Sequence, residues 1–93
     1  MFDPAILKRA GLGPSDVARL TGVTRVAATR WLNGTSAPGA HTRGAAQKLV
    51  DVVTRAVEAG ELPVPVHVTR RERLLYIKTV LATHEVEVLL ADD

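Results

Sequence analysis

The chain contains no cysteine, which excludes disulfide bonds, cysteine-ligated zinc and a thiol nucleophile. No run of apolar residues approaches the roughly 18 that a membrane span needs, and no secretion signal is present, so we expect a cytoplasmic protein without a membrane partner. Aromatic residues are scarce, at 3% of the chain. Aliphatic side chains must therefore supply the core.

Nothing in the sequence has the spacing of a catalytic or metal site. A chain of 93 residues buries only a modest core, which does not favour a deep catalytic pocket. The serines, Asp16 and the histidines show no pattern of nucleophile, base and orienting group. The three histidines lie 26 and 17 residues apart with no thiol nearby. We therefore expect no enzyme, no metal and no cofactor.

Positive charge is concentrated in the first half of the chain. Residues 1–50 hold seven lysines and arginines against two acidic residues, whereas residues 51–93 hold five against eight. The net charges of the two parts are therefore +5 and −3. This asymmetry indicates that the first half meets a polyanion. The alternative is an ordinary solvated surface on which the charges are unevenly scattered.

Four helices are predicted before residue 60, each bounded by residues that start or stop helices. The expected start and stop residues, in chain order, are Asp3-Pro4 and Gly11, Pro14 and Gly22, Thr24 and Asn33-Gly34, and Thr42 and Gly60. The last of these helices covers roughly residues 43–59, after a loop at residues 34–40.

The pattern changes after Glu61. Residues 61–68 contain two prolines and alternating valines, which predicts an extended segment or an edge strand. Residues 69–72 match a capping box, and a helix is expected to follow. Residues 83–90 alternate as in a strand, but they also continue a helical spacing from Leu74 and Leu81. The sequence leaves helix and strand open there.

The predicted third helix has two different faces. On a helical wheel Ala27, Ala28 and Trp31 form a small apolar side with one large anchor. The opposite side carries short polar residues and the arginines. A helix whose side chains are short apart from projecting arginines suits the major groove of B-DNA, where arginine can bind guanine through two hydrogen bonds.

This spacing resembles the helix-turn-helix of the Cro and lambda-repressor family of phage and bacterial regulators. The match reads Val17-Ala18, three residues, Gly22-Val23-Thr24, then Ala28-Thr29-Arg30-Trp31 and the closing Asn33-Gly34. It covers about residues 4–59. The chain departs from the family pattern at Pro14, where a phosphate-binding glutamine is frequent, at Thr21, where leucine is usual, and at Ala28, where isoleucine or valine is usual.

The resemblance implies a mainly α fold. We expect a compact four- to five-helix DNA-binding domain over residues 1–60 and a C-terminal dimerisation segment over residues 61–93, formed by a helix with or without a short strand. By position in the motif, the residues that face base edges are Arg25, Val26, Thr29 and Arg30. Those expected near phosphates are Thr24, Asn33, Thr35, His41, Thr42, Arg43 and Lys48.

A homodimer is expected because one short helix reads only a few base pairs, and two copies can meet successive major grooves about 34 Å apart. The alternative is that the apolar C-terminal segment folds back on its own domain. The residues expected at the dimer interface are Leu74, Leu75, Ile77, Leu81, Val86 and Val88.

The function expected from these features is sequence-specific binding of double-stranded DNA by a homodimer. We expect a transcriptional repressor that recognises an inverted-repeat operator through the helix at residues 25–32. The alternatives are an antitoxin whose C-terminal segment binds a protein partner, and a protein-interaction adaptor that keeps the helix-turn-helix as a scaffold.

Overall fold

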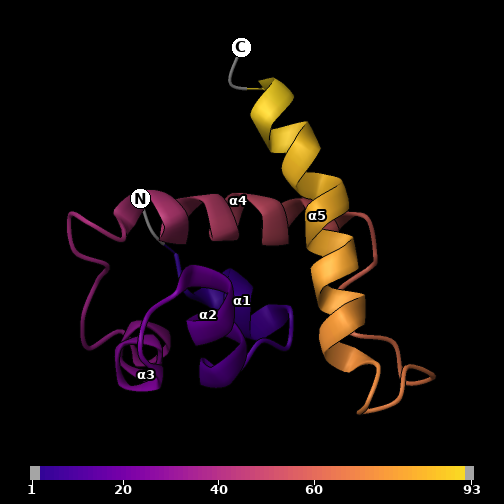
Figure 1. The fold of residues 1–93 in the computed structure, drawn as a ribbon, viewed down its shortest axis with the longest axis horizontal. Helices are drawn as coiled ribbons and strands as arrows, with labels where there is room; N and C mark the ends of the chain where they lie inside the picture. Colours follow the sequence, from indigo (N-terminus) through magenta and orange to yellow (C-terminus); the bar gives the residue numbers. More distant parts are fainter. Residues whose placement is uncertain (1–2, 92–93) are drawn as a thin grey trace.

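The helices begin and end close to the residues that the sequence indicates. The computed structural model describes residues 3–91, with the side chains of residues 3–85, and over this range it contains five α-helices and no strand (Figure 1). The expectation of a mainly helical domain is therefore confirmed for the described residues. The helices are α1 (Ala5–Arg9), α2 (Pro14–Thr21), α3 (Arg25–Asn33), α4 (Arg43–Glu58) and α5 (Arg73–Ala91).

A short turn joins α2 to α3. Gly22 ends α2 with a φ of 77°, a left-handed conformation that side chains disfavour. Thr24 Oγ1 then accepts a hydrogen bond from the Ala27 N–H at 3.1 Å, as expected of an N-cap residue. Residues 22–24 therefore suffice to connect the two helices, which pack against each other.

The start of α4 is predicted at the right place, but the predicted cap is wrong. The Thr42 hydroxyl donates to the Gly39 carbonyl at 3.4 Å and does not cap α4. The N–H groups of Thr42 and Arg43 both donate to that same carbonyl, at 3.1 and 2.8 Å. This preceding turn gives Thr42 a helical backbone, whereas a capping side chain usually needs an extended one.

The edge strand considered for residues 61–68 is also wrong, because these residues form an irregular segment with a turn at residues 66–67. The segment is fixed by tertiary contacts instead of a strand ladder. Leu62 is only 3% exposed, and the Tyr76 hydroxyl donates to the Glu61 carbonyl at 2.7 Å. Residues 3–91 contain no strand with which this segment could pair.

Residues 83–90 belong to α5, so the helical alternative is correct and the strand is wrong. The capping box before α5 is confirmed, since the Glu72 N–H donates to Thr69 Oγ1 and the Thr69 N–H donates to Glu72 Oε1, both at 3.3 Å. The buried side chains of α5 recur every three or four residues, at Ile77, Val80, Leu81 and His84. Helical spacing therefore continues into this region.

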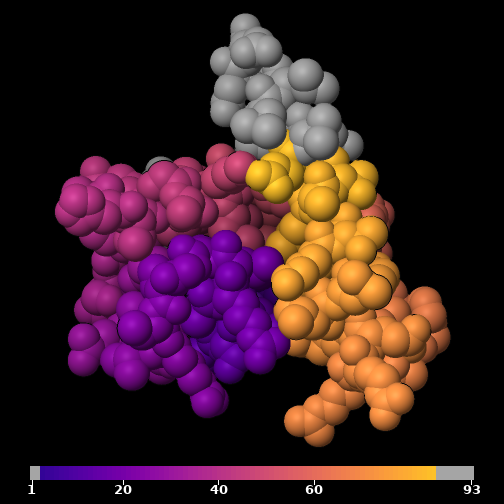
Figure 2. Space-filling view, in the orientation of Figure 1, coloured from indigo at the N-terminus to yellow at the C-terminus, as the bar shows by residue number. Residues whose placement is uncertain are grey.

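One core joins the parts of the chain on either side of residue 60. The largest fully buried side chains come from four helices and are Leu7, Val17, Val53 and Ile77. Figure 1 shows α5 crossing α4, and Figure 2 shows the first half of α5 packed beside the N-terminal helices. The described residues before and after residue 60 therefore share a hydrophobic core, and α5 is in part a structural element of the first segment.

Candidate nucleic-acid interface

Buried residues on one side of α3 hold it on the rest of the domain. Ala28, Trp31 and Leu32 are 0, 4 and 6% exposed, and they belong to the same core cluster as Val17 of α2. The expectation that Trp31 is a core residue is confirmed. Because this side is fixed, the orientation of the opposite side of α3 is set by the core.

The four residues expected to face base edges lie on the outer side of α3. Arg25, Val26 and Arg30 are exposed, and Thr29 is half-buried. Val26 is 62% exposed, which makes it one of only three large apolar side chains left open among those described. The Thr29 hydroxyl donates to the Arg25 carbonyl at 2.8 Å, which leaves its methyl group as the part available to a thymine methyl. The outer face of α3 can therefore offer two guanidinium groups and two small apolar groups to a groove.

The residues expected near phosphates are more scattered. Thr24, Asn33 and Thr35 lie at the ends of α3 and are exposed, and the Thr35 hydroxyl donates to the Arg30 carbonyl at 3.2 Å. His41 and Arg43 are exposed at the start of α4. Figure 1 shows that the connection between the two helices carries the start of α4 away from α3. The structure thus brings only the first three of these side chains next to the outer face of α3.

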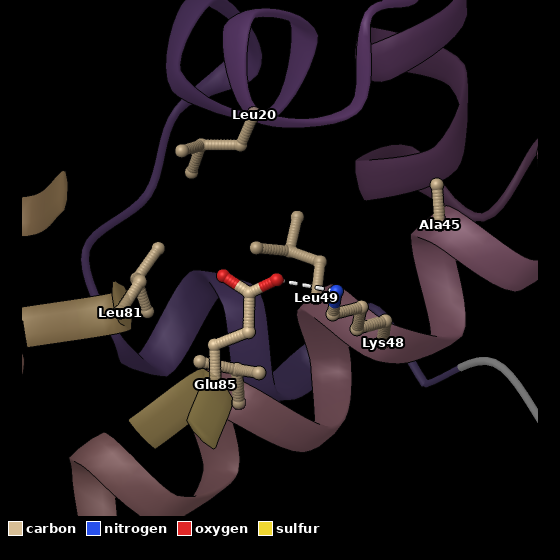
Figure 3. Close-up of a pocket in the computed structure, with 7 residues that line it drawn as sticks. Leu20, Ala45, Lys48, Leu49, Leu81 and Glu85 are labelled. Atoms are coloured by element: carbon tan, nitrogen blue, oxygen red, sulfur yellow. Dashed lines mark ion pairs between the residues drawn. The ribbon is translucent and has the colours of Figure 1, made fainter. Parts of the chain in front are cut away.

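Lys48 is paired within its own chain. Its ammonium group forms an ion pair with Glu85 of α5, and both side chains are partly exposed. The pair lies at a pocket of about 240 Å³, which Figure 3 shows between α2, α4 and α5. Lys48 therefore has an anionic partner within its own chain, with which a phosphate would have to compete, and its contact with phosphate stays a prediction.

The pocket itself is small and mostly apolar. Leu20, Ala45, Leu49, Val52 and Leu81 line it beside the ion pair. Pockets that enclose small-molecule ligands usually measure roughly 300–1,000 Å³. The lining residues include no pair of nucleophile and base.

A partly buried ion pair that the sequence did not indicate joins the start of α5 to the start of α2. Arg73 Nη1 and Nη2 lie 2.8 Å from the two carboxylate oxygens of Asp16, and Nη2 also donates to the Gly11 carbonyl at 3.0 Å. Asp16 Oδ2 in turn accepts a hydrogen bond from the Gly13 N–H at 2.9 Å. The two residues are 57 positions apart, and no local pattern could have paired them.

These contacts change the titration of Asp16. Burial by itself would raise the pKa of its carboxyl group, but the hydrogen bonds from Arg73 and Gly13 outweigh burial, and the pKa lies below its usual value of 3.8. The pKa of Arg73 is raised, chiefly by the same hydrogen bond. The ion pair therefore stabilises the fold whenever Asp16 is charged.

Replacing Arg73 by methionine is expected to lower the free energy of unfolding by about 2 kcal/mol at neutral pH, since a largely buried carboxylate loses its charged hydrogen-bond donors. Because the pKa of Asp16 is lower in the folded than in the unfolded protein, its contribution is present above about pH 3.8 and is lost as the pH falls through the folded value. The difference between wild type and variant should shrink accordingly in urea unfolding at acid pH. Arg71→Met is the matched control, because Arg71 is exposed. Equal stability of wild type and Arg73→Met at neutral pH would contradict a structural role for the pair.

The residues expected at a dimer interface fall into three groups. Ile77 and Leu81 are 0 and 7% exposed and pack in the chain's own core, so they are not available to a second copy and we remove them from that set. Leu74 is half-buried and Leu75 is 70% exposed. Val86 and Val88 lie in α5, but their side chains are outside the described ones. The folding back of α5 on its own domain thus accounts for part of the apolar C-terminal segment.

Over residues 3–91 no helix is long and apolar enough to cross a membrane. Nor do the histidines, aspartates and glutamates of this part of the chain gather in a group of three that could hold a metal ion.

Comparisons with known proteins gave no match. No protein-family model matches the chain, and no curated protein and no solved structure is significantly similar to it.

Proposed function

We propose that the protein binds double-stranded DNA sequence-specifically, with α2 and α3 forming a helix-turn-helix of the lambda-repressor type and α3 lying in the major groove. One observation carries the proposal: the side of α3 that faces away from the core holds Arg25, Val26 and Arg30 in exposed positions. Side chains on this face are short apart from the two arginines, so the backbone of α3 can approach base edges closely. The three-residue turn between α2 and α3 and the buried Ala28 and Trp31 fit the same motif.

Each arginine is suited to bind the O6 and N7 atoms of a guanine, and Val26 and the methyl group of Thr29 are suited to contact thymine methyl groups. Thr24, Asn33 and Thr35 at the two ends of α3 are placed to contact backbone phosphates and fix the position of the helix on the duplex. We further propose that the protein acts as a transcriptional repressor at an inverted-repeat operator.

The experiment that tests this proposal is selection of bound duplexes from a random library at a stated salt concentration. We expect a recovered motif that contains guanine and thymine and that is repeated in inverted orientation at a spacing of one or more whole helical turns. Recovery of no preferred sequence would contradict the proposal and favour a scaffold that binds another protein.

The homodimer that this proposal requires is expected to use the outer face of α5. Leu75 is 70% exposed there, and the sequence beyond Glu85 contains Val86, Val88, Leu89 and Leu90. We propose that Leu75 and this further apolar run contact a second copy, because contiguous exposed apolar surface marks interaction sites. This part of α5 is therefore our candidate for the two-fold interface.

Replacing Leu75 by glutamate is expected to raise the dimer dissociation constant at least about 30-fold, which corresponds to about 2 kcal/mol, because the carboxylate would be desolvated at the interface. Sedimentation equilibrium at micromolar concentration measures this change. Val66→Glu is the matched control, since Val66 is fully exposed in the segment before α5. Monomeric wild-type protein, both with and without DNA, would rule out the dimer.

A further inference from the structure

Positive charge gathers immediately before α5. Arg70 and Arg71 are exposed, and no ion pair or hydrogen bond joins either guanidinium group to another described side chain. The adjacent carboxylate, Glu72, is directed to Thr69, whose hydroxyl lies 2.6 Å from Glu72 Oε1. Residues 51–93 carry a net negative charge, yet three of their five basic residues lie within residues 70–73. The two arginines therefore form a local cationic site on an otherwise acidic half of the chain.

Arg70 and Arg71 directly precede the N-terminus of α5, where positive charge is unfavourable. The N-terminus of a helix carries a partial positive charge, which favours anions and disfavours cations. The first turn of α5 itself contains no acidic residue, and the carboxylate of Glu72 just before it is held by Thr69. Asp16 compensates Arg73, but Arg70 and Arg71 have no such partner among the described residues. An anion bound at this position would interact favourably with both arginines and with the helix end.

The ion pair of Arg73 fixes where the two arginines lie. Its contacts with Asp16 and with the Gly11 carbonyl hold the start of α5 beside the start of α2. Figure 1 shows α3 and the segment before α5 at the two ends of one edge of the molecule, the lower edge in that view, with α1 and α2 between them. In Figure 2 atoms of the segment before α5 extend beyond this edge. The arginines and α3 can therefore face the same partner.

The dimensions of the molecule suit a duplex along this edge. The long axes of the described chain measure 35 and 34 Å, and one turn of B-DNA is about 34–36 Å long. A duplex that places its major groove on α3 would therefore bring its phosphate backbone past the other end of the edge as well.

We propose that Arg70 and Arg71 form a second DNA-contacting site, which binds backbone phosphates of the same duplex whose bases α3 reads. This inference rests on the proposed function. The site carries no base-reading geometry, and its role is to add affinity and to fix the tilt of the domain on the duplex. Because Arg73 anchors it to α2, the site holds the C-terminal part of the chain in a defined position relative to α3.

The test compares Arg70→Gln/Arg71→Gln with wild type on the duplex recovered by selection, with Kd measured between 50 and 200 mM salt. Each phosphate contact contributes about 0.9 to the slope of log Kd against log salt, so the variant should lose about 1.8 per bound copy of the chain. Over this range its Kd should therefore rise about tenfold less than that of wild type for each bound copy, and about 100-fold less for a homodimer. Base preference should not change. Ethylation interference should show phosphates that matter to wild type and not to the variant.

Lys78→Gln is the control, because Lys78 is exposed on α5 about two turns beyond Arg71 and its loss removes charge without removing the site. Circular dichroism checks that the variants keep their helices. If wild type binds its selected duplex and the double variant retains the full salt slope, the second site is refuted and the proposed function stands. If wild type selects no duplex, the proposed function itself is refuted, and the second site with it.

Discussion

Replacing Arg25 or Arg30 by alanine is expected to weaken binding to the selected duplex by about 5- to 150-fold for each substitution, equivalent to about 1–3 kcal/mol. Both side chains are exposed on the outer face of α3, so their removal should not disturb the core. Alanine is also the residue with the highest helix propensity, and the helix itself should persist. The loss would therefore report on DNA contacts and not on folding.

The base dependence of the loss identifies its cause. Removal of a contact to a guanine should relax preference at one position of the site and leave the other positions unchanged. Binding is best measured by fluorescence anisotropy with the selected duplex and with duplexes that carry single base changes. Lys78→Ala serves as the control for the loss of one exposed positive charge. An unchanged profile of base preference in the double variant Arg25→Ala/Arg30→Ala would favour the adaptor alternative over DNA reading.

Replacing Trp31 by alanine is expected to have the largest effect on stability, at about 3–5 kcal/mol. Trp31 is 4% exposed and is the only tryptophan in the chain, so its removal leaves a cavity beneath α3 that smaller neighbours such as Ala28 do not fill. Small domains are commonly stable by about 5–15 kcal/mol, so this loss is a large fraction of the total.

Urea unfolding followed by circular dichroism measures this loss. Val26→Ala is the matched control in the same helix, since Val26 is 62% exposed and should change stability by less than about 0.5 kcal/mol. Trp31→Phe should recover part of the lost stability. A Trp31→Ala variant with wild-type stability but lost DNA binding would identify the indole as a contact to bases and not as part of the core.

The helix boundaries could be predicted from the sequence where a residue acts on its own backbone or on near neighbours. Pro14, Gly22, Thr24 and Gly34 act through their own backbone preferences or through hydrogen bonds to residues a few positions away, and the boundaries of α2 and α3 follow from them. The cap predicted at Thr42 is wrong because the Thr42 hydroxyl and the N–H groups of Thr42 and Arg43 all donate to the Gly39 carbonyl. The alternation at residues 83–90 did not decide the structure, since Leu81 and His84 are buried on one side of a helix.

The candidate site, like the fold, could be predicted from the sequence only where local signals decide it. The outer face of α3 could be derived from the sequence, because a helical wheel fixes which residues lie opposite Ala28 and Trp31. The partner of Lys48 and the pair of Asp16 with Arg73 depend on how α5 packs, and contacts between residues so distant in the chain are not encoded in local periodicity. Ile77 and Leu81 were assigned to the dimer interface for a similar reason. The spacing of apolar residues shows which side of a helix is covered, but not whether the same chain or a second copy covers it.

The central claim is that the outer face of α3 lies against the bases of a duplex. Nuclear magnetic resonance tests it most directly, by titration of isotope-labelled protein with the selected duplex while the amide signals of the backbone and the Nε–H signals of the arginines are followed. We expect the largest shifts in α3, with the side-chain signals of Arg25 and Arg30 among them, and small shifts along α4. Large shifts elsewhere with α3 unchanged would contradict the claim.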